Sequence, residues 1–272
     1  MDPTLENAPW AAAFAGLLML ASFVRGLIWI LHLWKTQRDP NKQEIREAAI
    51  WSTFDTERNS EGRFQWMDLL WLLLACVGAA VIHPLVMPFA GIGFGVWLLS
   101  RRGIPVSTLW GWRWDELPTY LGRGLDRYLL ILFPVSMVLG ATLFLSKQMG
   151  WEAGAQPLVL EFLAIEDTWK VAGLVFAAVV VAPVWEELFF RGILYPMMRG
   201  LRDRVFALLT TSILFGLVHA HGPSLIALAL FGGALAWIYE RTGKIGCAMA
   251  LHAAFNTGTA VTLLLIKYAP AH

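Results

Sequence analysis

The chain has 272 residues, of which 57% are hydrophobic and 15% are charged, and it contains 14 Trp and 16 Phe. Soluble domains average about 45–50% apolar residues, so this composition excludes an ordinary soluble domain and predicts a helical protein that crosses a membrane several times. The net charge of +1 excludes a nucleic-acid-binding surface, because no stripe of Lys and Arg could neutralise a phosphate backbone. Cys76 and Cys247 lie in separate apolar runs, which excludes a disulfide framework and a thiolate metal site.

The N-terminal part, residues 1–165, is predicted to hold the first spans together with amphipathic interfacial segments. Its first apolar run, residues 10–34, is long enough to cross a hydrocarbon core of about 30 Å. Acidic Asp2 and Glu6 precede this run where a signal peptide would be basic, so we expect a retained span. Arg25 within the run is expected to snorkel to the span end or to pair with another helix.

Residues 35–65 are polar, and residues 43–54 in their middle could form a surface helix. The next apolar run, residues 66–99, would make a single helix of about 51 Å, which is too long for a bilayer. The prolines at and after the His83-Pro84 step therefore predict a hairpin of two short spans.

Residues 101–127 are basic, broken by prolines and rich in interleaved Trp and Arg, which predicts a segment that lies in the headgroup region. Residues 128–145 form the next apolar span. The C-terminal part, residues 166–272, contains four further apolar segments, at 169–199, 205–220, 225–240 and 245–266. Glu240 and Arg241 are expected at the membrane surface.

Together these segments predict an all-α, polytopic transmembrane helical bundle with about eight spans. With that count, the basic loops at 35–63, 101–127, 199–204 and 241–244 share one side of the membrane, and the acidic N-terminus and the 152–167 loop share the other. The positive-inside rule then predicts cytoplasmic basic loops and external termini. The pattern is typical of a multi-pass protein of a prokaryotic cytoplasmic membrane.

Three ionisable residues, Glu186, Glu187 and Arg191, interrupt the apolar stretch at residues 181–192, and charged side chains within a span normally serve a pathway, a partner or a reaction. On a helix, Glu187 and Arg191 are four residues apart and face each other, whereas Glu186 is rotated by about 100° from Glu187. Glu187 is thus neutralised locally and Glu186 is not, which makes Glu186 the candidate general base. Pro183 is expected to kink the helix and to free backbone groups nearby.

Two other spans supply candidate partners for Glu186. Phe215 and His219 share one helical face, as do His252 and Asn256, because each pair is four residues apart. At 1.5 Å per residue from the proposed cytoplasmic ends, Glu186 and His219 lie roughly 20 Å deep, and the 252–256 pair roughly 10–16 Å deep. The side chains are therefore expected to meet at similar depth.

Three patterns in this order, each within an apolar segment, resemble the signature motifs of the CAAX-prenyl-protease and bacteriocin-processing family, the glutamic intramembrane proteases also called ABI proteins. The run from Phe231 to Gly243 also resembles the stretch that precedes the family's third motif. The resemblance covers roughly residues 170–265. The three patterns are Pro183-x-x-Glu186-Glu187-x-x-Phe190-Arg191-Gly192, Phe215-x-x-x-His219 and His252-x-x-x-Asn256.

The resemblance implies an intramembrane endopeptidase that hydrolyses a peptide bond near the C-terminus or membrane boundary of a membrane protein or peptide substrate, without a metal or another cofactor. It implies that Glu186 and His219 activate a water molecule, and that His252 and Asn256 form the oxyanion site. Supporting roles would fall to Glu187, Arg191 and Phe215.

Two other interpretations use the same polar residues. Glu186, His219 and His252 could form a catalytic zinc site of the His₂Glu type, although the chain has no H-E-x-x-H helix. The cluster could also serve a non-proteolytic membrane scaffold or transporter as a structural knot or a proton path. Insensitivity to chelators would argue against the first, and loss of cleavage on Glu186→Gln would argue against the second.

Overall fold

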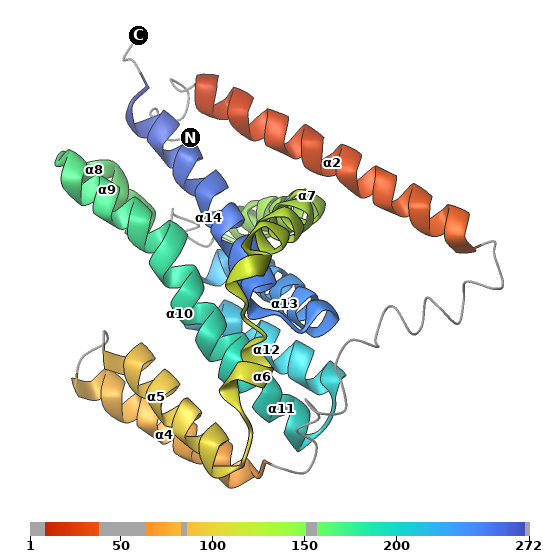
Figure 1. The fold of residues 1–272 in the computed structure, drawn as a ribbon. Helices are drawn as coiled ribbons and strands as arrows, with labels where there is room; N and C mark the ends of the chain where they lie inside the picture. Colours follow the sequence, from red (N-terminus) through yellow and green to blue (C-terminus); the bar gives the residue numbers. More distant parts are fainter. Residues whose placement is uncertain (1–8, 38–63, 83–85, 151–156, 270–272) are drawn as a thin grey trace.

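The computed structural model describes residues 9–37, 64–82, 86–150 and 157–269 of the chain (Figure 1). Regular structure in these ranges is helical throughout, without a β-strand. Five helical segments in the described ranges are long and apolar enough to cross a membrane: Pro9–His32, Trp114–Gln148, Thr168–Leu201, Gly222–Thr242 and Ile245–Lys267. Shorter apolar helices occupy Trp66–Ile82, Phe89–Arg101 and Arg204–Val218. The predicted all-α polytopic bundle is confirmed.

Helix α2 (Pro9–Gln37) lies along the outside of the bundle, against α7 (Leu117–Gln148) and α14 (Ile245–Lys267) (Figure 1). Two of its polar contacts are with α7. Arg25 Nε lies 2.6 Å from Asp126 Oδ1, and Ser22 Oγ accepts a hydrogen bond of 2.7 Å from the Phe133 backbone N–H. Arg25 thus has the interhelical partner that was one of its two predicted roles.

Helices α4 (Trp66–Ile82) and α5 (Val86–Arg101) form the predicted hairpin at another edge of the bundle (Figure 1). Helix α5 joins the hairpin to the core, where Phe89 meets Trp185 edge to face with ring centroids 4.4 Å apart. The predicted break at His83 and the predicted surface helix at residues 43–54 lie outside the described residues.

The segment predicted to lie wholly at the interface, residues 101–127, is divided in the structure. Its first part contains the short helices α6 (Val106–Trp110) and η3 (Trp114–Glu116), and residues 117–127 form the start of the long helix α7. Pro118 stands in the first turn of α7, where a backbone N–H has no intrahelical acceptor, so the proline costs no hydrogen bond. Pro118 therefore begins a helix here.

The helical rod that carries the first motif runs from Thr168 to Leu201 with two π-helical turns. Asp167 caps its start by accepting from the Trp169 and Lys170 N–H groups. Each π turn ends shortly before a proline, Pro183 or Pro196, whose ring crowds the preceding helical carbonyls. The rod consists of α9 (Thr168–Phe176), η4 (Ala177–Val181), α10 (Ala182–Phe189), η5 (Phe190–Leu194) and α11 (Tyr195–Leu201).

The remaining predicted C-terminal segments match α12 (Arg204–Val218), α13 (Leu225–Thr242) and α14 to within a few residues. Two further short helices are α8 (Pro157–Ala164) and η6 (Gly222–Ser224). Helices α12 and α14 pack against the first-motif rod, α13 is hydrogen-bonded to it through Arg191 and Tyr195, and α7 packs on α13 and α14; several of these contacts need glycine. Small residues at helix interfaces let membrane helices approach closely.

Replacing Gly124 in α7 by Ala is expected to destabilise the protein by about 1–3 kcal/mol. The added Cβ would lie 2.5 Å from Ala250 Cβ and 2.6 Å from both Ala250 C and Leu251 N, and these atoms of α14 cannot rotate away. Unfolding of the detergent-solubilised protein would measure the effect. Gly122→Ala is the matched control, because nothing lies within 4 Å of its Cβ. Equal stability of the two variants would contradict the close packing of α7 and α14.

Glu240, predicted at the membrane surface, is buried within the protein near the C-terminal end of α13. The residue is 3% exposed, and the Tyr195 hydroxyl donates a hydrogen bond of 2.7 Å to its Oε2. Arg199 Nη1 lies 3.1 Å from its Oε1. Helix α11 therefore covers the end of α13, and the carboxylate links the two helices.

Candidate active site

Glu187 is the centre of a buried ion-pair network. Its Oε1 lies 3.0 Å from Arg191 Nη1 and 2.8 Å from His252 Nδ1. Arg191 also donates a hydrogen bond of 2.7 Å to the Gly232 carbonyl in α13, and its guanidinium lies 4.9 Å from the Phe215 ring centroid. Glu187 and Arg191 are both fully buried. The predicted contact within one helix is present, and it also connects α13 and α14 to the first motif.

Glu186 meets both predicted histidine partners. Its Oε2 lies 3.9 Å from His252 Nε2 and 4.0 Å from His219 Nε2. Oε2 itself is enclosed and accepts no hydrogen bond from any residue in the described ranges. The side chains of Glu186 and His219 are 31% and 30% exposed, whereas His252 is 4% exposed. The site therefore has an accessible side, formed by Glu186 and His219, and a closed side, formed by His252.

Hydrogen bonds fix which nitrogen of each imidazole faces Glu186. His219 Nδ1 lies 2.7 Å from the Phe215 carbonyl oxygen, and His252 Nδ1 lies 2.8 Å from Glu187 Oε1. Carbonyl and carboxylate oxygens only accept, so both Nδ1 atoms carry hydrogen. Both Nε2 atoms are thereby directed at the same carboxylate oxygen of Glu186.

Aromatic rings hold the two imidazoles in place. Phe215, which is fully buried, contacts the rings of His219 and His252 at centroid distances of 4.9 and 5.7 Å. Phe231 meets His252 nearly perpendicularly at 5.3 Å. Edge-to-face contacts of this kind restrict ring orientation. Phe215 thus contacts both imidazoles.

Asn256 lies one turn beyond His252 and binds the backbone of the first-motif rod. Its Nδ2 donates a hydrogen bond of 2.7 Å to the Ala178 carbonyl in the π turn η4. In a π turn the carbonyl of residue 178 would pair with the N–H of residue 183, which is proline and has none. Asn256 therefore satisfies the carbonyl that Pro183 leaves open, and one of its two amide hydrogens is used for this.

Replacing Asn256 by Ala is expected to destabilise the protein by about 1–3 kcal/mol, because the Ala178 carbonyl loses its donor. Pro183→Ala restores a backbone N–H, so the same Asn256→Ala change should have a smaller effect in that background. A double-mutant cycle on unfolding free energies measures the difference. Additive effects of the two substitutions would contradict the pairing of Asn256 with the carbonyl that Pro183 exposes.

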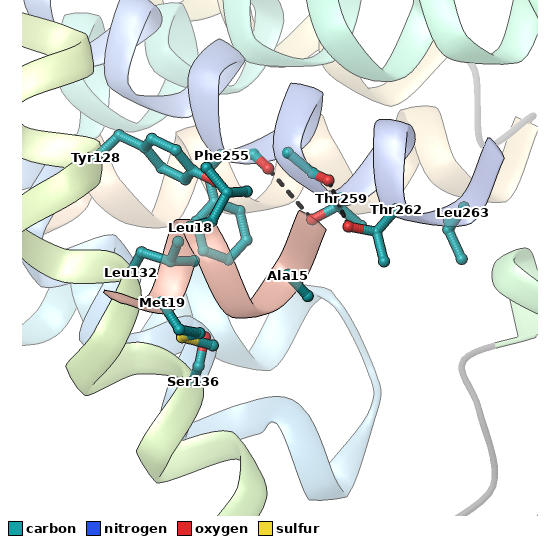
Figure 2. A pocket seen from close by; sticks show the side chains of 11 residues that line it. Ala15, Leu18, Met19, Tyr128, Leu132, Ser136, Phe255, Thr259, Thr262 and Leu263 are labelled. Atoms are coloured by element: carbon teal, nitrogen blue, oxygen red, sulfur yellow. Dashed lines mark hydrogen bonds between the residues drawn. The ribbon is translucent and has the colours of Figure 1, made fainter. Parts of the chain in front are cut away.

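An apolar cavity of about 210 Å³ lies between α2, α7 and α14 and is bordered by Phe255, next to Asn256 (Figure 2). The hydroxyls of Thr259 and Thr262 in its wall donate to backbone carbonyls of α14, at 3.2 and 2.9 Å. Phe255 stacks on Phe231 with centroids 4.3 Å apart, and Phe231 contacts His252. The rings of Phe255 and Phe231 thus connect the cavity to His252.

Sequence reasoning missed two backbone groups of this site, the carbonyls of Ala178 and Gly232. Neither has a signal of its own in the sequence, since any residue carries a carbonyl. The available hints were Pro183, which frees one of them, and the Gly232-Gly233 pair in the run that resembles the family. At Gly232 an added Cβ would lie 2.9 Å from Phe215 Cβ, so the close approach requires glycine.

The fold and this cluster define a multi-span helical membrane protein with an acid and two imidazoles inside the bundle. Residues 168–258 match the family model described as type II CAAX prenyl endopeptidase Rce1-like. A Bacillus subtilis (strain 168) protein named "Putative membrane peptidase YdiL" is 23% identical over 215 residues, which cover 71% of this chain and 86% of the relative. No solved structure matches the chain significantly. The matched region contains all three motifs, and the two comparisons together with the apolar helices support a multi-pass membrane protease.

Proposed function

We propose that the chain is a glutamic-type intramembrane endopeptidase that cleaves a membrane protein or peptide near its C-terminus or at the membrane boundary. The observation that carries this proposal is the approach of two histidine Nε2 atoms to one enclosed oxygen of Glu186, at 3.9 and 4.0 Å. Neither distance is a hydrogen bond. Separations of this size suit a water molecule that contacts both the carboxylate and an imidazole.

Glu186 and His219 activate this water. With Nδ1–H held by the Phe215 carbonyl, His219 in its neutral form offers an Nε2 lone pair, as Glu186 offers Oε2. The water donates its two hydrogens to these acceptors, which turns an oxygen lone pair toward the scissile carbonyl. As the new C–O bond forms, Glu186 takes a proton, and it then delivers that proton to the amine nitrogen when the C–N bond breaks.

His252 and Asn256 stabilise the oxyanion. Glu187 accepts from His252 Nδ1 and orients the ring, so that Nε2 serves as a donor to the oxyanion when it carries hydrogen. Asn256 contributes the amide hydrogen that Ala178 does not use. Arg191 compensates the charge of Glu187 and holds it in place, so the residues that orient the donors are themselves fixed by α10, η5 and α13.

The zinc alternative fits the geometry less well. Ligands about 2.0–2.1 Å from a tetrahedral ion lie roughly 3.3–3.4 Å apart, whereas the Glu186 oxygen lies 3.9 and 4.0 Å from the two imidazoles. Chelator treatment separates the two mechanisms. We expect unchanged hydrolysis after incubation with a strong chelator, and a loss that zinc restores would establish the metal mechanism instead.

Hydrolysis is tested with the full-length protein in liposomes that also hold membrane proteins extracted from cells lacking it. New peptide termini are identified by mass spectrometry. His219→Ala should lower the rate of their appearance by about 10²–10⁴-fold. His221→Ala is the matched control and should retain the wild-type rate, because its Nδ1 lies 2.6 Å from Ser224 Oγ and the proposed mechanism does not use it. New termini that appear equally with both variants would refute the proposal.

A further inference from the structure

A second cavity, of about 490 Å³, lies on the α4–α5 hairpin, away from Glu186. It lies beside the N-terminal part of α4 and the C-terminal part of α5, at one end of the apolar hairpin that the two helices form. Its lining combines aromatic and charged side chains, among them Asp68, Trp71, Phe94, Trp97, Arg101 and Arg102. Nothing in the proposed hydrolysis uses these residues.

The charges in this cavity favour an anion. Asp68, whose side chain is 7% exposed, accepts from Arg102 Nη2 at 2.7 Å with each oxygen, and from the Gln65 backbone N–H at 2.8 Å. Its acceptor capacity is therefore largely used by one arginine. Arg101 has no carboxylate partner among the residues that the structure describes; its guanidinium lies 5.8 Å from the Trp97 ring centroid. Two guanidinium groups and one carboxylate leave the cavity with a net positive charge.

The donors are also suited to phosphate. Arg102 is held in one orientation by Asp68 through Nη2, which leaves the N–H groups of Nε and Nη1 for another acceptor. Arg101 adds a second guanidinium beside it on the chain. Planar guanidinium groups bind phosphate oxygens through paired hydrogen bonds, and an arginine already fixed by a carboxylate loses little side-chain entropy on binding.

The aromatic residues indicate that the phosphate belongs to a lipid. Trp71 and Trp97 are 54% and 53% exposed, and they stand near the ends of apolar helices, where Trp typically anchors a helix at headgroup depth. Below them, the exposed side chains of Leu74 and Val77 continue along α4 as an apolar surface. A free anion would use the arginines alone, whereas a phospholipid would also cover the indole rings and this surface.

We propose that this cavity binds the phosphate-bearing headgroup of an anionic phospholipid, with its acyl chains along the outer face of α4. The arginines hold the phosphate, and the tryptophans set its depth. The site is independent of peptide hydrolysis, so its failure would leave the proposed protease mechanism untouched.

The test measures phospholipid binding by native mass spectrometry of the full-length protein, with phosphatidylglycerol and phosphatidylcholine as probes. We expect wild type to retain phosphatidylglycerol preferentially. Arg101→Gln should weaken phosphatidylglycerol binding by about tenfold, the effect of one charged hydrogen bond, and weaken phosphatidylcholine less, because its choline cation already balances the phosphate. This substitution keeps the Asp68–Arg102 pair, and an unchanged unfolding temperature would confirm an intact fold.

The control is Arg202→Gln, which removes an equally basic residue, with a side chain 68% exposed, outside the cavity. It should bind phosphatidylglycerol as wild type does. Equal losses in both variants, no loss in Arg101→Gln, or equal binding of the two lipids by wild type would overturn the proposal. Inorganic phosphate at matched concentration should not displace the lipid; displacement would identify a free-phosphate site and exclude the lipid.

Discussion

Replacing Glu186 by Gln is expected to lower the rate of peptide hydrolysis by about 10³–10⁴-fold or more, because the amide cannot accept the proton of the attacking water. The fold should be unaffected. Gln has nearly the shape of Glu, and the Oε2 atom that it replaces makes no hydrogen bond within the described part of the chain. The change in unfolding free energy should stay within about 1 kcal/mol. Hydrolysis in liposomes and thermal unfolding of the same preparation measure both quantities.

Glu161→Gln supplies the control for this substitution, since Glu161 is an exposed residue of α8 and should be replaceable without loss of activity. The result also separates the protease from a scaffold or transporter. A scaffold needs the polar cluster only for its structure, so its phenotype would survive Glu186→Gln. Hydrolysis that persists in Glu186→Gln at more than a tenth of the wild-type rate would remove Glu186 from the role of general base.

The parts of the site that sequence reasoning predicted follow from local geometry. A spacing of four residues is sufficient to place Arg191 beside Glu187, and a shift of one residue is sufficient to turn Glu186 elsewhere. The approach of His219 and His252 to Glu186 was predicted from their similar depth and from the family resemblance. Helix limits were also predictable, because apolar runs in a membrane protein must end close to the bilayer surface.

The contacts that sequence reasoning missed depend on how separate helices pack. Glu187 was paired with Arg191 alone, but its Oε1 also binds His252, on a helix that is remote in sequence. Asn256 was assigned to the oxyanion, yet it also binds the Ala178 carbonyl, because a π turn shifts the helical pairing so that this carbonyl faces Pro183. A π turn adds one residue to a helical turn, and single-helix periodicity does not reveal it.

Local polarity does not reveal which polar residues the rest of the protein covers. Tyr120, in the segment predicted to lie in the headgroup region, is 1% exposed. Glu240, predicted at the membrane surface, is 3% exposed. Burial requires hydrogen-bond partners for both side chains. The Tyr120 hydroxyl accepts from the Arg113 backbone N–H and donates to the Gly111 carbonyl, whereas Glu240 accepts from the Tyr195 hydroxyl and from Arg199. Such coverage is a property of tertiary packing.

The second large effect is expected at Arg191. Replacing it by Met should destabilise the protein by about 3–5 kcal/mol, because Met fills much of the same volume but leaves a buried carboxylate without its cation. Glu187 would keep His252 as a partner, but the Gly232 carbonyl would lose its donor at 2.7 Å. Denaturant unfolding of the solubilised protein measures the loss. Arg191→Lys should recover only part of the stability, since one ammonium group does not reproduce the fork that reaches both Glu187 and Gly232.

Arg202→Met is the control for this series, because Arg202 is largely exposed beside Asp203, and its replacement should change stability by no more than about 0.5 kcal/mol. The pair itself is tested by Glu187→Gln combined with Arg191→Met. If Arg191 acts chiefly by compensating Glu187, the double variant should be more stable than the sum of the single effects predicts, by about 0.5–3 kcal/mol. Additive losses would instead place the role of Arg191 in its contacts with Gly232 and Phe215. In that case the arginine fixes α13 against the first motif, and the charge of Glu187 is balanced through His252.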